Sequence, residues 1–146
     1  LLPVVREQSD DFAALLAPLG DAGARHRYAP GKWSLKEMIG HLVDTERLFI
    51  YRAMTFARDD ATDLPGMDEN EWVVATDFDA LPLEDLLAEY RAVREATLRF
   101  FGNLDETAYA RRGTANGMKW GVNCVPWLVA GHERHHLNVV KERYLD

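Results

Sequence analysis

The sequence holds one cysteine, Cys124, and no run of apolar residues near the about 20 that a membrane-spanning helix needs. A single cysteine cannot form a disulfide within the chain, which is typical of proteins from a reducing compartment. The opening letters LLPVVREQSDD reach charged residues too soon for a signal peptide. We therefore expect a cytoplasmic protein without a membrane partner. Because the chain does not start with methionine, we also expect some N-terminal residues to lie outside this sequence.

Positive charge is also scarce. The 17 lysines and arginines are outnumbered by 24 aspartates and glutamates, which leaves a formal net charge of −7. An acidic surface repels phosphate backbones, so we expect no general nucleic-acid binding. The sequence contains no glycine-rich phosphate loop, no G-x-S-x-G motif and no CxxC pair. It therefore gives no support for a nucleotide-binding loop, a serine hydrolase or a dithiol site.

What is present is the composition of a globular protein, with 47% hydrophobic and 10% aromatic residues. A length of 146 residues suits a single domain over residues 1–146. Apolar residues recur with the helical period in four segments, at about residues 1–19, 34–57, 82–102 and 123–144. Ser34 and Glu37 have the spacing of a capping box, and Asn123 is expected to cap the last helix.

The longest connection between these helices covers residues 58–81, which is long for a loop in a compact domain. Such a length predicts a crossover between two helices that are not hairpin neighbours. Within it the letters DENEWVVA predict a short helix, and EWVVATDF gives only a weak strand signal. The glycine-rich residues 105–121 are predicted to be irregular. The fold class is therefore all-α, a four-helix bundle with a long crossover connection.

Three histidines lie close together near the end of the chain, in the letters HERHH. His132 and His136 are four residues apart, so in a helix they stack on one face. That face is otherwise aliphatic and should point into the bundle; its other members are Val125, Val129, Val139 and Val140. His135 falls on a more polar stripe, so we expect it at the rim or in solvent. Two inward imidazoles one turn apart are half of a metal site.

A third ligand should come from another helix, and only two histidines remain. His26 lies in a predicted loop between two arginines, which would repel a cation. His41 lies about two turns into the second helix, beside apolar residues. We therefore predict a metal site made of His41, His132 and His136. The alternative is that each is a core histidine hydrogen-bonded to a neighbour.

The same letters also match H-E-x-x-H, in which Glu133 would be the general base of a zinc peptidase. Such an enzyme takes its third ligand downstream, and only ten residues follow His136. We therefore disfavour the peptidase and expect Glu133 to be a solvated helix residue, or a partner of Lys141 or of the neighbours of Arg134.

Two acidic residues follow His41 closely, and either could orient its imidazole from a second shell. They are Asp44 and Glu46, and a third candidate for that role is His135. For the two acids we favour surface pairing with Arg47 or Arg52. Cys124 is expected to be a small buried thiol, and the tryptophans are expected in the core or along a pocket: Trp33, Trp72, Trp120 and Trp127.

Two segments carry a resemblance to a known family. The letters PGKWSLKEMIGHL contain W-S-x-x-E-x-x-x-H, and the terminal GHERHHLNVVKERYL contains H-x-x-H-H. With the LPGMDENEW stretch between them, the chain resembles the DinB-like (DinB/YfiT) superfamily of metal-dependent four-helix enzymes. The resemblance implies an up-down-down-up bundle, often a homodimer. It also implies a divalent metal, nickel or zinc, whose three histidine ligands match His41, His132 and His136.

The resemblance further implies thiol chemistry, because characterised relatives use a low-molecular-weight thiol as co-substrate. We therefore expect an enzyme that transfers such a thiol to a small electrophilic substrate in stress response or detoxification. A metal with open positions can lower the pKa of a thiol, but it can equally activate water. A metal-dependent hydrolase remains an alternative, and so does a non-catalytic stress protein that binds a metal or ligand. No catalytic or substrate-binding side chain is identified beyond the metal site.

Overall fold

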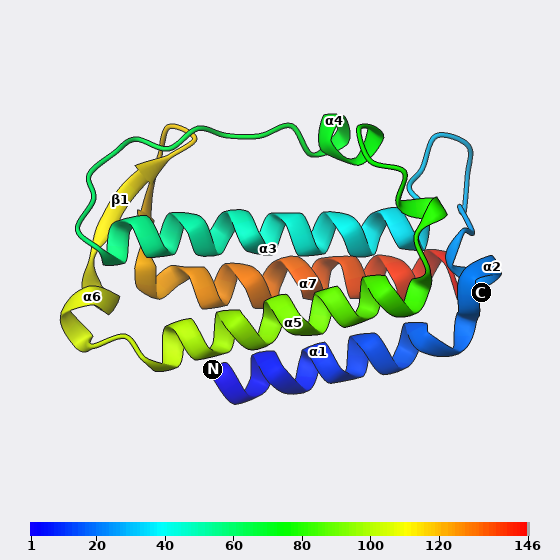
Figure 1. Cartoon of the computed structure of the whole chain (residues 1–146), viewed down its shortest axis with the longest axis horizontal. Helices are drawn as coiled ribbons and strands as arrows, with labels where there is room; N and C mark the ends of the chain where they lie inside the picture. The colour runs from blue at the N-terminus through cyan, green and yellow to red at the C-terminus, as the bar shows by residue number, and fades with distance from the viewer. Residues whose placement is uncertain (146) are drawn as a thin grey trace.

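The structure, a computed structural model, describes residues 1–145, and its four long helices lie side by side (Figure 1). They are α1 (Leu2–Leu16), α3 (Leu35–Ala57), α5 (Leu83–Gly102) and α7 (Val125–Arg143). Helices α1 and α7 run in one direction, and α3 and α5 run in the other (Figure 1). The predicted up-down-down-up four-helix bundle is therefore confirmed. None of the helices within residues 1–145 is both long and apolar enough to cross a membrane.

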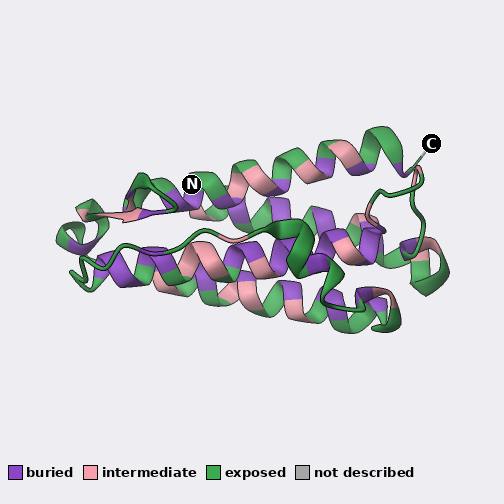
Figure 2. Cartoon of the chain, turned by 90° about the horizontal axis from the view of Figure 1, so that it is seen from above, coloured by how far each residue is buried: buried purple, intermediate pink, exposed green. Residues whose placement is uncertain are grey.

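The connection between α3 and α5 is long because of how the four helices pack. Helix α3 packs against α5 and α7, and α1 packs against the same two helices. Because α3 and α5 are parallel neighbours, their connection must return along the length of the bundle. It contains α4 (Glu69–Val74) and the 3-10 helix η2 (Phe78–Ala80), and much of it is exposed along one face (Figure 2). The predicted crossover and its short helix are confirmed, and EWVVATDF forms no strand.

The predicted N-cap is found at α3 but not at α7. The backbone N–H of Glu37 donates to Ser34 Oγ at 3.0 Å, and the backbone N–H of Ser34 donates to the Glu37 carboxylate at 2.8 Å. This confirms the capping box of α3. At α7 the prediction was wrong, because the 3-10 helix η3 (Val122–Cys124) precedes the helix and puts Cys124 at its N-cap. At the other end, α1 continues into η1 (Ala17–Leu19) and α2 (Gly20–Ala24).

The stretch before α7 was predicted to be irregular but contains regular structure. It forms α6 (Glu106–Ala110) and an antiparallel hairpin of β1 (Arg112–Ala115) and β2 (Met118–Gly121). The turn residues Asn116 and Gly117 have φ angles of 52° and 71°. Positive φ at both positions is what a two-residue type I′ hairpin turn requires, and Asn-Gly is its preferred sequence. Leu64 of the crossover bridges to Ala115, which ties the crossover to this hairpin.

The apolar core is divided into two clusters, one toward each end of the bundle. One cluster joins the start of α3 and α5 to the end of α1 and α7, and the other joins the end of α3 and α5 to the start of α7. Between them lies a layer of buried polar side chains: Gln8, Ser9, His41, Thr45, Glu46, Arg94, Thr97 and Glu133. Buried polar groups are costly unless they are hydrogen-bonded. This central polar layer is therefore where a specific function is expected.

Several side chains expected in the interior lie outside it. Trp120 is buried, but Trp72 is 42% exposed and Trp127 is 65% exposed. The free thiol of Cys124 is exposed as well. Trp127 shares an outer stripe of α7 with Gly131, one turn further along, while the buried positions of the helix lie on other stripes. Cys124 is therefore not the buried thiol that was expected, and Trp72 and Trp127 lie outside the core.

We expect one glycine of α3 to be required for the crossover to pack. A Cβ atom on Gly40 would lie 2.3 Å from the Phe78 ring of η2. Gly40→Ala should therefore lower the free energy of unfolding by about 1–3 kcal/mol. Gly131→Ala on α7 is the matched control, because its Cβ would meet no atom within 4 Å, and it should raise stability by about 0.5–1 kcal/mol. Urea denaturation measures both, and equal effects would contradict the packing argument.

Candidate metal centre

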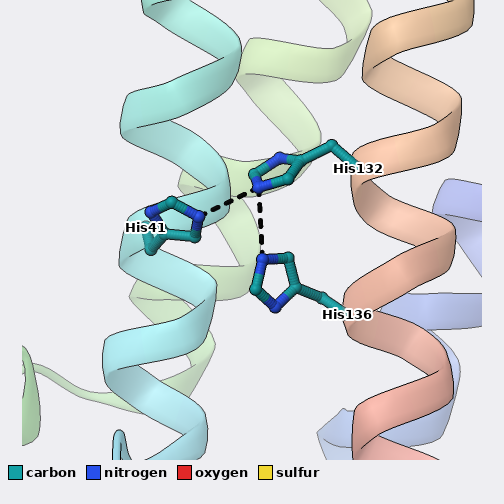
Figure 3. Close-up of side chains that lie close together, drawn as sticks. All are labelled: His41, His132 and His136. Atoms are coloured by element: carbon teal, nitrogen blue, oxygen red, sulfur yellow. Dashed lines mark hydrogen bonds between the residues drawn. The ribbon is translucent and has the colours of Figure 1, made fainter. Parts of the chain in front are cut away.

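Helices α3 and α7 bring three histidines to one point between them (Figure 3). His41 Nε2 lies 2.9 Å from His132 Nε2, and His132 Nε2 lies 3.1 Å from His136 Nε2. One ring nitrogen from each residue lies within 4.8 Å of the other two. The structure therefore groups the three histidines that the sequence singled out. His26 lies elsewhere, with its ring beside that of Tyr144.

The position of His132 Nε2 is the most informative feature of this cluster. An imidazole nitrogen presents one site in the ring plane, either a hydrogen or a lone pair. His132 Nε2 faces two other Nε2 atoms at hydrogen-bonding distance, so ordinary hydrogen bonds cannot satisfy both contacts. A single cation between the rings accepts all three lone pairs at once.

The donor set and its spacing also fit a divalent metal. Zinc and nickel both accept imidazole nitrogen ligands. Two nitrogens bonded to one ion at about 2.0–2.1 Å lie roughly 3 Å apart. The observed separations of 2.9 and 3.1 Å are of that size. The residues present therefore fit a divalent metal held by three histidines.

The protonation state of the cluster suits ligation. Burial, and then the neighbouring imidazoles, lower the pKa of His41, His132 and His136 to about 4. All three rings are therefore neutral near pH 7, and a metal need not displace their protons.

The surroundings of the rings are one hydroxyl and several aromatic side chains. Thr45 Oγ1 lies 3.3 Å from His41 Nδ1. With a metal at His41 Nε2, Nδ1 would bear the hydrogen and could donate it to Thr45 Oγ1, which would fix the tautomer. The Trp33 ring lies 4.8 Å from that of His41, and Phe49 lies 6.0 Å from His132, between ring centroids. Sequence reasoning missed Thr45, although its position one turn after His41 is a usable signal.

The two acids that the sequence offered to orient an imidazole pair with arginines instead. Asp44 is 4.0 Å from Arg47, as the favoured surface pairing expected. Glu46 is buried and binds Arg94 of α5, so its expected surface pairing was wrong. Neither acid hydrogen-bonds to a histidine within the part of the chain that the structure describes. His135 is exposed, as predicted, with its ring 5.0 Å from that of His136.

Glu133 corrects a further expectation. It was predicted to be solvated, but it is 1% exposed and accepts a hydrogen bond from Arg94 of α5. Its neighbours His132 and His136 meet His41 of α3 instead. A carboxylate bound to Arg94 cannot serve as the general base of a peptidase. The position of Glu133 therefore argues against a zinc peptidase of the H-E-x-x-H type.

A cavity of about 290 Å³ reaches the cluster at His136. Its lining is partly apolar, with Tyr28, Trp33, Met38, Val139 and Tyr144, and partly polar, with Lys32, Glu69, Asn70 and His135. Glu69 belongs to α4, so the crossover forms one side of the cavity. Neither Lys32 nor Glu69 forms an ion pair with any residue from 1 to 145. These side chains are free to meet a polar ligand.

The lowered pKa values predict acid sensitivity in the metal-free protein. The unfolded histidines titrate near 6.5 and the folded ones near 4, so between these values the unfolded chain binds more protons. The stability is therefore fully present above pH 6.5 and is lost as the pH falls toward 4.

We expect the free energy of unfolding to fall faster between about pH 7 and 5 than in a variant with all three histidines changed to glutamine. Urea denaturation of both proteins, without metal, measures the difference. Parallel pH profiles would show that the three rings are not held neutral by the fold.

Two curated bacterial proteins resemble the chain over most of its length. A protein of Geobacillus thermodenitrificans (strain NG80-2) is 27% identical over 139 residues, which cover 92% of this chain and 77% of that protein. A protein of Oceanobacillus iheyensis is 24% identical over 125 residues, which cover 84% and 71% respectively. Both are provisionally named metal-dependent hydrolases.

Among solved structures, the chain resembles YfiT from Bacillus subtilis, described as a probable metal-dependent hydrolase with an unusual four-helix bundle topology. The TM-score is 0.78, and the match covers 97% of this chain and 84% of YfiT. At 15% identity this likeness shows a shared fold. The sequence pattern of the DinB superfamily matches residues 5–140, a span that includes all three clustered histidines. The chain therefore belongs to the DinB superfamily.

Proposed function

We propose that His41, His132 and His136 hold one divalent metal ion, nickel or zinc, and that the protein is a metal-dependent hydrolase. The observation that carries this proposal is the position of His132 Nε2, which faces two other Nε2 atoms at 2.9 and 3.1 Å. The names of the two curated relatives support hydrolysis as the reaction class.

A divalent metal held by these histidines would lower the pKa of a water or thiol bound beside them. The chain's own residues provide the setting. Thr45 lies within hydrogen-bonding reach of His41 Nδ1 and would hold its tautomer, and the rings of Trp33 and Phe49 pack beside His41 and His132. The cavity at His136 admits a small substrate, and Lys32 and Glu69 stand on its wall to meet polar groups.

An open site favours an enzyme over a non-catalytic metal protein. A closed coordination sphere would need a fourth side-chain ligand, and the sequence offered Asp44, Glu46 and His135. Asp44 lies by Arg47 and Glu46 binds Arg94. Within the described residues, the group of possible ligands at this point comprises the three histidines alone. Room for a further ligand therefore remains on the side of the cavity.

Thiol transfer to an electrophile is the second candidate, and one observation favours it. Across residues 1–145, no carboxylate hydrogen-bonds to the three clustered rings, whose near neighbours are Thr45 and aromatic side chains. A thiol has a pKa of about 8.5 and loses its proton near a metal without a general base. A low-molecular-weight thiol in the cavity would therefore need no acidic partner from the protein.

The metal site predicts the metal content of the purified protein. Without chelators, we expect about one nickel or zinc ion per chain, as three histidines and an open position can hold. His136→Ala should remove it, because only two imidazoles remain. His135→Ala is the matched control, since this neighbouring ring is exposed and outside the cluster, and it should keep the metal. Elemental analysis measures the metal content of each protein. A wild-type protein that holds no metal, even after incubation with nickel or zinc, would contradict the proposed site.

The two candidate functions differ in the nucleophile, water or a thiol, so an assay for each reaction can distinguish them. With zinc- or nickel-loaded protein, hydrolysis of a p-nitrophenyl ester should release p-nitrophenolate, and His132→Ala should lose this activity by at least about a hundredfold. His26→Ala should retain it. Consumption of a low-molecular-weight thiol with an aryl halide, without ester hydrolysis, would select thiol transfer instead. Full activity after removal of the metal would contradict both candidates.

A further inference from the structure

One buried side chain, Arg94 of α5, contacts all four long helices. Its Nε and Nη2 donate to the two carboxylate oxygens of Glu46 on α3, at 3.0 and 2.9 Å. Nη2 also donates to Glu133 on α7, and Nη1 donates to the carbonyl oxygen of Val5 on α1 at 3.1 Å. The guanidinium lies 5.4 Å from the centre of the Tyr90 ring. The fork of Arg94 therefore fixes each neighbouring helix relative to α5.

Its two carboxylate partners are placed next to the histidines. Glu133 directly follows His132 on α7, and Glu46 lies five residues after His41 on α3. Rotation of α7 that turned Glu133 away from Arg94 would also turn His132 away from His41. A bidentate contact between guanidinium and carboxylate defines direction as well as distance. The hydrogen bonds of Arg94 and the convergence of the histidines thus depend on the same helix rotations.

Stability alone is a poor account of this arrangement. Arg94, Glu46 and Glu133 are each less than 5% exposed. Buried ion pairs lose hydration, and apolar side chains of similar volume often replace them with equal or higher stability. A role in fixing geometry explains what a contribution to stability does not.

We propose that Arg94 is a positioning residue for the metal centre, holding Glu46 of α3 and Glu133 of α7 so that His41 and His132 converge. This inference rests on the proposed metal site. In this proposal Glu133, the acidic residue of the H-E-x-x-H motif, orients α7, the helix that bears His132 and His136.

When Arg94 alone is replaced by an uncharged residue, electrostatics and positioning predict opposite changes in the affinity for a cation. Loss of a positive charge near the cluster should by itself strengthen the binding of a cation. Loss of the two helix contacts should weaken it, because outer partners of metal ligands affect affinity by about 10–100-fold. The direction of the change therefore separates the two effects.

The test uses Co²⁺ as a probe of the metal-free full-length protein. We compare the dissociation constant and the visible absorption spectrum of bound Co²⁺ in the wild type, Arg94→Met and the triple variant Arg94→Met, Glu46→Leu and Glu133→Leu. The triple variant leaves no unpaired buried charge, so it should fold even where Arg94→Met does not. Arg47→Met is the matched control, because Arg47 joins α3 to Glu89 of α5 at the surface. Circular dichroism and the thermal midpoint monitor folding.

We expect the triple variant to fold with a thermal midpoint near that of the wild type. The triple variant also loses net negative charge, which by itself weakens cation binding, so its deciding readout is the spectrum: the bound Co²⁺ should have an altered spectrum. Where Arg94→Met folds, it should bind Co²⁺ at least about tenfold more weakly, while Arg47→Met matches the wild type. A folded triple variant with the wild-type spectrum would overturn the positioning role and leave the metal site intact. A triple variant that fails to fold would also overturn it, because the residues would then be structural. A wild type that binds no Co²⁺ contradicts the proposed function itself.

Discussion

The meeting of three neutral imidazoles between α3 and α7 is the constraint on which the rest of the structure depends. Each imidazole nitrogen offers either one hydrogen or one lone pair, so hydrogen bonds cannot satisfy both contacts of His132 Nε2, and the helices must hold the rings in place. The topology supplies the required antiparallel pair, in which α3 packs directly on α7. In this topology α3 and α5 are parallel neighbours, so a long crossover must connect them. The crossover is put to use, because α4 forms one side of the cavity.

Much of this arrangement could be predicted from the sequence because its signals are local. Helical periodicity located the four long helices, and the capping box placed the start of α3 within one residue. The i,i+4 spacing and an aliphatic stripe separated His132 and His136 from His135. His41 followed by elimination, since one other histidine remained and its surroundings were cationic. Each of these inferences needs only residues a few positions apart, or a choice among very few candidates.

The missed features depend on partners that are distant in sequence. Glu133 was expected in solvent because a lone carboxylate on a helix usually is; its burial requires Arg94, 39 residues earlier. The period of a helix does not reveal which polar side chains will find such a partner. The hairpin before α7 was missed for another reason. Asn-Gly is a signal for a hairpin turn, but the short glycine-rich segments on either side of Asn116-Gly117 carry no strand pattern of their own.

The contact between the two ends of the site also bears on how the protein is handled. The hydroxyl of Tyr144 donates to the backbone carbonyl of Trp33, and both residues line the cavity. The last turn of α7 therefore forms part of the rim, at the opposite end of the bundle from the start of α1 (Figure 1). A histidine-rich segment attached directly after Leu145 would begin beside the cavity and offer competing imidazoles. The same segment attached directly before Leu2 would begin at the far end of α1, away from the cavity.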